Sequence, residues 1–116
     1  MSHCIFCRIA AGEIPARRVL EDDDVVAFHD ANPQAPVHVL VVPRRHVASI
    51  SELSPDDQEL SGRLLDAAIR VAQTLDLAGP GKGYRLVINT GPDGGQSVFH
   101  VHVHVLGGRA LAWPPG

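Results

Sequence analysis

The 116-residue sequence has few cysteines, few aromatic residues and no excess of basic charge. Ten lysines and arginines stand against thirteen aspartates and glutamates, for a formal net charge of −3. We therefore expect no basic footprint for nucleic acid or for an anionic membrane. No stretch approaches the roughly 18 consecutive apolar residues of a membrane-spanning helix, and the first residues do not resemble a secretory signal peptide. These absences predict a cytoplasmic protein with neither nucleic acid nor membrane as a partner.

The two cysteines, Cys4 and Cys7, lie three positions apart near the amino terminus. A reducing cytoplasm disfavours a structural disulfide, which leaves two reduced thiols or half of a metal site. A redox pair is less favoured, because such a motif normally follows a strand, and no strand is predicted here. Tetrahedral zinc requires two further ligands. We expect a structural zinc site of Cys4, Cys7, His46 and His100, because His46 follows a predicted strand and His100 ends a row of histidines.

The most informative segment is residues 100–105, where histidine and valine alternate strictly. Alternation is the period of a β-strand, so His100, His102 and His104, the histidine row, share one face and the valines the other. Neighbouring histidine positions would lie about 6.6 Å apart and the outer two about 13 Å apart. This spacing argues against one metal ion held by all three. A neutral imidazole can instead attack phosphorus, provided that an acceptor holds its other ring nitrogen.

A glycine-rich segment, residues 90–97, precedes the histidine row and is called the glycine loop below. Glycines let backbone N–H groups converge on an anion, and Gln96 and Ser97 add side-chain donors. An anion cradle beside a row of imidazoles predicts phosphoryl chemistry rather than a histidine-rich strand without a function.

For other candidate residues, a purely structural role in the core is an alternative to a functional one. His38 interrupts an apolar predicted strand, where it is either a hydrogen-bonded core histidine or a residue that orients the histidine row, because an unpaired buried imidazole is costly. Asp30, Phe28 and Ile9 fit contacts with a ribose and a base, although a phenylalanine on a strand is a core residue by default.

The order of the elements predicts one α+β domain over residues 1–116, with a mainly antiparallel sheet of about five strands. Ser54 and Pro55 begin a long helix as its cap and first turn. Its apolar stripe is Leu60, Leu64, Ala68, Val71 and Leu75, and residues 79–81 are its expected stop. The other predicted elements are a short helix at 4–12 ended by Gly12, a hairpin of strands at 17–21 and 24–30, a buried central strand at 37–42, and strands at 84–89 and 100–105.

Several of these motifs together resemble the histidine triad (HIT) superfamily. They are the histidine row and residues 28–30, 34–38 and 94–97, with a tail that ends in Trp-Pro-Pro-Gly. The Gln-Ser pair and the tail are similar to the Hint branch, the purine nucleoside phosphoramidases. The resemblance covers nearly the whole chain. It implies a HIT-like fold and a homodimer, with a sheet that continues across the two subunits and a nucleotide cleft in each.

The resemblance also implies roles for individual residues. His102 would be the nucleophile that takes the nucleotide as a phosphohistidine, and His104 would contact the α-phosphate. His100 and His38 would hold the histidine row in register, and Trp113 would reach the partner subunit's site. Ser97 would stabilise charge on the phosphoryl oxygens. The positions that match substrate contacts are Asn89, Gly95, Gln96 and Ser97 near the phosphate, and Phe6, Ile9, Phe28, Asp30 and Ala31 around the nucleoside, with Asp30 on the ribose hydroxyls.

We therefore expect a hydrolase that cleaves purine nucleoside 5′-phosphoramidates to the monophosphate and an amine. No cofactor is needed for this chemistry, and the two-cysteine amino terminus resembles the zinc-containing members of the superfamily. Two alternatives remain open. One is a dinucleoside polyphosphate hydrolase of the Fhit type, and the other is a nucleotide-binding or partner-binding module whose catalysis is incidental.

Overall fold

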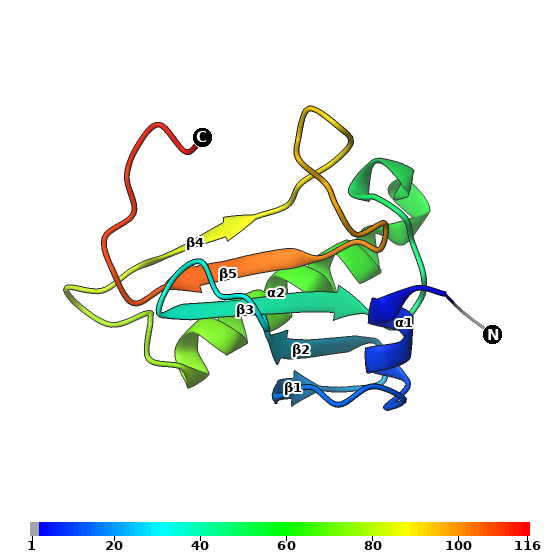
Figure 1. Ribbon diagram of the computed structural model, residues 1–116, viewed down its shortest axis with the longest axis horizontal. Helices are drawn as coiled ribbons and strands as arrows, with labels where there is room; N and C mark the ends of the chain where they lie inside the picture. Colours follow the sequence, from blue (N-terminus) through cyan, green and yellow to red (C-terminus); the bar gives the residue numbers. More distant parts are fainter. Residues whose placement is uncertain (1–2) are drawn as a thin grey trace.

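The computed structural model describes residues 3–116 as an antiparallel sheet between a long and a short helix (Figure 1). The sheet has five strands in the order β1-β2-β3-β5-β4, and each neighbouring pair is antiparallel. This arrangement confirms the predicted α+β class. The elements are α1 (Ile5–Ala10), β1 (Arg18–Glu21), β2 (Val25–His29), β3 (Val37–Pro43), short 3-10 turns at Ile50–Glu52 and Pro55–Asp57, α2 (Gln58–Thr74), β4 (Tyr84–Val87) and β5 (Val103–Gly107).

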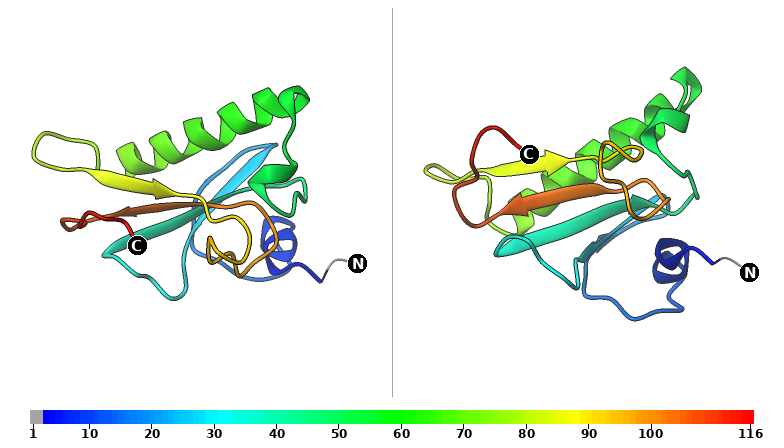
Figure 2. Two further views of the ribbon diagram at one scale, coloured as in Figure 1. Left: turned by 90° about the horizontal axis from the view of Figure 1, so that it is seen from above. Right: turned by 45° about the horizontal axis from the view of Figure 1, so that its top comes forward.

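The two faces of the sheet carry separate hydrophobic clusters, as Figure 2 shows by placing α2 above the sheet and α1 below it. Alternate residues of a strand point to opposite faces. Ala27 and Val41 accordingly pack with the α2 cluster, whereas Phe28 and Leu40 pack with the α1 cluster. His38 lies two residues from Leu40 on β3, so its side chain belongs to the α1 face.

The central strand β3 brings His38 beside the histidine row. β3 pairs with β5 in a register that sets Leu40 opposite His104 and His38 opposite Leu106. The two histidines therefore lie on one face of adjacent strands, offset by two residues. The prediction that the strand at 37–42 is buried and central is confirmed.

Ser54 is a cap as predicted, but α2 itself begins later than expected, at Gln58, and it ends earlier than expected. Ser54 caps a 3-10 turn that leads into α2, and Leu64 is buried in the stripe against the sheet. The helix ends at Thr74 rather than at residues 79–81, because Asp76 adopts a φ of +61° and the Leu77 N–H bonds back to the helix. Aspartate tolerates this left-handed conformation better than most residues, so it can replace glycine here.

No helix within residues 3–116 combines the length and the apolar character needed to cross a membrane.

The predicted strand at 100–105 begins later than expected, because β5 starts at Val103. Its partner β3 ends at Pro43, which has no N–H to give to a ladder. The Val101 N–H instead bonds to the carbonyl of Val47 at 2.7 Å. The segment still alternates, since Val101, Val103 and Val105 all pack in the α2 cluster. The predicted division of histidines and valines between two faces therefore holds although the strand boundary was wrong.

Candidate active site

Three imidazoles lie close together on the α1 face of the sheet. The ring centroids of His102 and His104 are 4.9 Å apart, and those of His38 and His104 are 5.1 Å apart. His102 Nδ1 lies 2.7 Å from the carbonyl oxygen of His100. Because a carbonyl oxygen only accepts, His102 carries its proton on Nδ1 and keeps a lone pair on Nε2. This is the protonation state that a nucleophilic imidazole requires.

The neighbouring His104 is held in the opposite tautomer by a chain of hydrogen bonds. The backbone N–H of Gln34 donates to His38 Nδ1 at 3.0 Å, so the proton of a neutral His38 is on Nε2. His38 Nε2 lies 2.8 Å from His104 Nδ1 and donates to it. The proton of His104 is therefore on Nε2. The carboxylate of Asp30 also lies near the His38 proton, 3.4 Å from His38 Nε2.

Burial favours the neutral forms of His38 and His104. It lowers the pKa of His104 to about 4, with further lowering by the nearby His102 and His38. Burial also lowers the pKa of His38, against the opposing effect of the Asp30 carboxylate. His104 Nε2 is buried and has no hydrogen-bond partner within residues 3–116. A buried N–H donor without a partner normally has a functional explanation, and a ligand oxygen beside His102 would provide one.

The side chain of Gln96 braces the glycine loop. Its Oε1 accepts from the Gly91 N–H at 3.0 Å, and its Nε2 donates to the carbonyls of Ala48 and Val98 at 2.7 and 3.1 Å. Both amide hydrogens are thus committed to backbone acceptors. The geometry therefore favours Gln96 as a residue that shapes the loop rather than as a donor to phosphate.

The glycine loop is closed by its own hydrogen bonds, which revises the expected anion cradle. The N–H groups of Gly91, Gly95 and Gln96 all donate to acceptors within the loop. A Cβ atom at Gly94 would overlap the backbone of Thr90, so the tight turn requires glycine there. These three N–H groups are therefore not offered to a ligand, whereas the buried His104 Nε2–H has no partner within residues 3–116.

Phe6 of α1 links the apolar cluster to the histidine row. Its ring meets those of His102 and His100 edge-on, with centroid distances of 5.1 and 6.0 Å. The ring of Phe28 packs against it at 5.6 Å, and Ile9 completes the same buried cluster. The structure thus brings Phe6, Ile9 and Phe28 together beside the candidate nucleophile.

The other residues expected to contact the substrate are half-buried or exposed. Asp30 is half-buried, and its Oδ1 accepts from the Asn32 N–H at 2.8 Å. Ala31 and Ser97 are exposed, and Asn89 is half-buried. The substrate contacts expected for these residues stay predictions.

The thiols and imidazoles of Cys4, Cys7, His46 and His100 converge at the amino-terminal side of the site. His100 Nδ1 lies 3.3 Å from Cys4 Sγ, 3.4 Å from Cys7 Sγ and 3.2 Å from His46 Nδ1, and the last of these lies 3.3 Å from Cys7 Sγ. The edges of a tetrahedron around zinc are about 3.3 to 3.8 Å for thiolate and imidazole ligands. His100 Nε2 donates to the Pro43 carbonyl at 2.7 Å, so its Nδ1 lone pair faces the cluster. The donor set fits tetrahedral zinc.

A comparison with protein-family models matches the HIT domain to residues 11–111. The chain belongs to the HIT family. An uncharacterised HIT-like protein from Synechococcus elongatus is 52% identical over 112 residues, which cover 97% of this chain and 96% of that protein.

Solved structures of HIT proteins have the same fold as this chain. The crystal structure of a HIT family hydrolase from Legionella pneumophila has a TM-score of 0.94 and 49% identity, over 98% of this chain and 100% of that one. A histidine triad nucleotide-binding protein from Candida albicans has a TM-score of 0.80 and 33% identity, over 96% of this chain and 82% of that one. The resemblance to the HIT superfamily is confirmed, whereas the assignment to the Hint branch stays a prediction.

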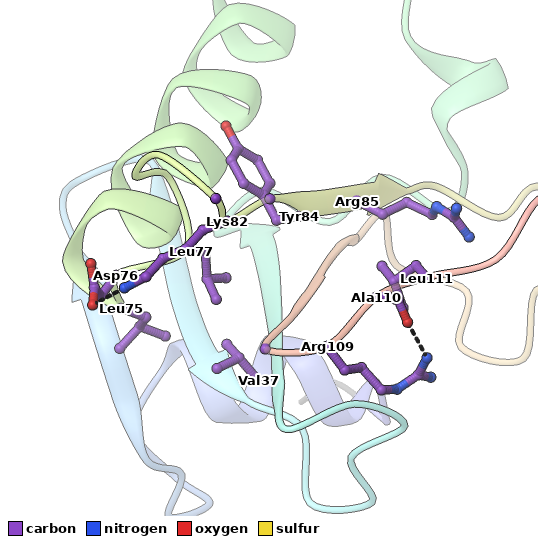
Figure 3. Close-up of a pocket in the computed structure, with 13 residues that line it drawn as sticks. Val37, Leu75, Asp76, Leu77, Lys82, Tyr84, Arg85, Arg109, Ala110 and Leu111 are labelled. Atoms are coloured by element: carbon purple, nitrogen blue, oxygen red, sulfur yellow. Dashed lines mark hydrogen bonds and ion pairs between the residues drawn. The ribbon is translucent and has the colours of Figure 1, made fainter.

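A large cavity of this HIT protein lies away from the histidine row (Figure 3). Its volume is about 750 Å³. Val37 lines it and packs with the α2 cluster, whereas His38, the next residue, faces α1. The other lining residues come from the segment that runs from the end of α2 into β4 and from the tail after β5, and sequence reasoning did not identify this cavity. Its apolar walls include Val37, Leu75 and Leu77, and its cations are Lys82, Arg85 and Arg109.

The pKa of His104 makes a testable prediction about acid conditions. Because the pKa of about 4 in the folded protein is below the ordinary value near 6.5, the unfolded chain binds more protons between these values. The contribution of His104 to stability is therefore complete above about pH 6.5 and is lost as the pH falls toward 4. We expect an NMR titration of the His104 ring in the folded protein to have its midpoint near pH 4. A midpoint at pH 6 or above would contradict the buried, neutral state.

Proposed function

We propose that this HIT protein is a hydrolase that cleaves purine nucleoside 5′-phosphoramidates to the nucleoside monophosphate and an amine. The observation that carries the proposal is the tautomer of His102, whose Nδ1–H is held by the His100 carbonyl while Nε2 keeps its lone pair. The similarity to a Legionella pneumophila protein described as a HIT family hydrolase supports hydrolysis. The similarity to a Candida albicans protein described as nucleotide-binding supports a nucleotide substrate.

In the first step, His102 Nε2 attacks the α-phosphorus and the phosphorus–nitrogen bond to the leaving group breaks. The amine nitrogen takes up a proton from solvent as it leaves. The imidazole becomes positively charged on forming its bond to phosphorus, and the His100 carbonyl stabilises that charge through Nδ1–H. The product of this step is a nucleotidyl group on His102.

In the second step, water attacks the same phosphorus, the bond to His102 Nε2 breaks, and one proton of the water passes to solvent. The monophosphate leaves, and His102 returns to its neutral form with a proton on Nδ1. His104 Nε2–H, which has no partner within residues 3–116, donates to a phosphoryl oxygen through both steps. A donor placed in advance beside a developing negative charge stabilises the transition state.

The nucleoside binds beside the α1 cluster. The base packs beside the cluster of Phe6, Ile9 and Phe28, with Ala31 nearby, and the Asp30 carboxylate accepts from the ribose hydroxyls with its remaining lone pairs. Ser97 and Asn89 flank the phosphate from the glycine loop and the end of β4. Gly95 and Gln96 contribute by shaping that loop.

A homodimer completes the site in this proposal. β4 is the last strand of the sheet within residues 3–116, and an open strand edge is a natural place for a second chain to pair. Pairing of two β4 edges would continue the sheet across the subunits. Trp113, which is 81% exposed in the single chain, would then extend toward the partner subunit's site.

Zinc bound by Cys4, Cys7, His46 and His100 is the second part of the proposal. The ligands come from the start of the chain, from the segment after β3 and from the histidine row, so the metal would fasten α1 to the row. Phe6 lies between the two cysteines in sequence and would be held against His102 as a result. The metal supplies structure rather than a catalytic step.

Metal analysis tests the zinc proposal without any activity measurement. Protein purified without chelators is expected to contain one zinc per chain, because the four donors fit one tetrahedral ion. Cys4→Ser and Cys7→Ser are expected to lose most of the metal and to unfold at a lower temperature. A wild-type protein without stoichiometric zinc after metal supplementation would exclude the proposal.

Turnover of adenosine phosphoramidate by wild type and by His102→Ala tests the reaction. We expect the loss of the nucleophile to lower the rate by about 10⁴-fold or more. His29→Ala is a matched control, because His29 lies two residues after Ala27 on β2 and therefore shares the α2 face with it. The rate of this variant should stay close to that of wild type.

A diadenosine polyphosphate assayed in parallel separates the alternatives. Cleavage of the polyphosphate alone would favour the Fhit-type reaction. Absence of turnover of either compound in folded protein that binds nucleotide would favour a binding module. Turnover that survives His102→Ala would contradict the covalent mechanism.

A further inference from the structure

A positively charged residue outside the histidine row is connected to it through one backbone segment. Arg109, in the tail after β5, donates from Nη2 to the carbonyl oxygen of Gln34 at 3.1 Å. The N–H of the same Gln34 donates to His38 Nδ1 at 3.0 Å. Arg109 is therefore one residue away from the bond that sets the tautomers of His38 and His104.

The segment that contains Gln34 has little regular structure of its own. Residues 30–36 form neither helix nor strand, and Pro33 and Pro36 have no N–H to donate. The side chain of Gln34 bonds only one turn back, to the Asn32 carbonyl at 3.0 Å. A contact from another element is therefore important for fixing the direction of the Gln34 N–H.

The turn after β5 approaches this segment closely. Gly108 has a φ of +91°, and a Cβ atom there would lie 2.8 Å from Cβ of Pro36. This approach therefore requires glycine. The position of Gly108 delivers the next residue, Arg109, to Gln34. Two contacts, one by packing and one by hydrogen bond, thus dock the tail on residues 30–36.

We propose that Arg109 is a positioning residue for the hydrolysis, acting through Gln34 and His38 on His104. The inference rests on the proposed function, because it assigns His104 Nε2–H to the phosphoryl oxygen. With Gln34 held in place, its N–H requires a lone pair on His38 Nδ1. The proton of His38 then stays on Nε2, and that of His104 stays on its own Nε2.

Loss of the hydrogen bond from Arg109 to Gln34 would change the tautomers of His38 and His104. A free neutral imidazole exchanges readily between its two tautomers. If His38 carried its proton on Nδ1, its bare Nε2 would face His104 Nδ1 and draw the proton of His104 to that nitrogen. His104 would then present a lone pair to the phosphate, which repels it instead of donating to it.

Arg85 provides a matched control on the same side of the molecule. Both arginines line the cavity in Figure 3 and both donate to carbonyl oxygens of the tail, Arg109 to Ala110 at 3.0 Å and Arg85 to Ala112 at 2.8 Å. Arg109 also donates to Gln34, whereas the hydrogen bond of Arg85 ends in the tail. Loss of Arg85 therefore tests a general effect on the tail.

The experiment compares full-length wild type, Arg109→Ala, Arg109→Lys and Arg85→Ala. Ring ¹⁵N chemical shifts report the tautomers of His38 and His104 without substrate, and kcat and KM are measured with adenosine phosphoramidate. For Arg109→Ala we expect mixed tautomers and a kcat lower by roughly tenfold to hundredfold, the scale of a misplaced catalytic group, with KM nearly unchanged. Arg109→Lys should restore part of kcat, and Arg85→Ala should match wild type.

The outcomes separate this inference from the proposed function. Mixed tautomers in Arg109→Ala together with an inactive wild type would support the positioning role and reject the phosphoramidase. An active wild type whose tautomers and kcat survive in Arg109→Ala would reject the positioning role alone. An equal loss in Arg85→Ala would also reject it, because the effect would then belong to the tail as a whole.

Discussion

The hydrogen bond from His102 Nδ1 to the carbonyl of His100 is the interaction on which the rest of the site depends. It leaves a lone pair on Nε2 of His102, the proposed nucleophile. The carbonyl is held in place from both sides of the chain, since the imidazole of His100 bonds to Pro43 and the N–H of Val101 bonds to Val47. These bonds can form because β5 starts only at Val103. If the strand began at His100, the His100 carbonyl and the Val101 N–H could be used for pairing with β3 instead.

The backbone sets complementary protonation states on two adjacent imidazoles. A carbonyl fixes the proton of His102 on Nδ1, and the N–H of Gln34 fixes the proton of His104 on Nε2 through His38. Burial lowers the pKa of His38 and of His104, which favours the neutral rings that these hydrogen bonds require. A ring with a lone pair on Nε2 and a ring with an N–H at Nε2 thus lie side by side, with their centroids 4.9 Å apart.

Much of this arrangement can be predicted from the sequence, because several patterns depend only on local geometry. Alternation in residues 100–105 assigns the faces in any extended backbone, and Ser54 and Gly12 act as caps within a single turn. The rest depends on contacts between distant segments. The side-chain amide of Gln96 donates to the carbonyl of Ala48, and this partner cannot be identified from the sequence because it lies 48 residues away. The donation of the Gln34 N–H to His38 likewise requires the loop to close, and no residue pattern encodes it.

Detection of the covalent intermediate tests the central claim most directly. Wild-type protein is mixed with adenosine phosphoramidate and quenched within a turnover in alkaline denaturant, since a phosphorus–nitrogen bond to histidine is labile in acid. Mass spectrometry is expected to find one added adenylyl group per chain, located on the peptide segment at His102. An adduct on His104 or on another residue, or turnover without any adduct, would contradict attack by the lone pair of His102.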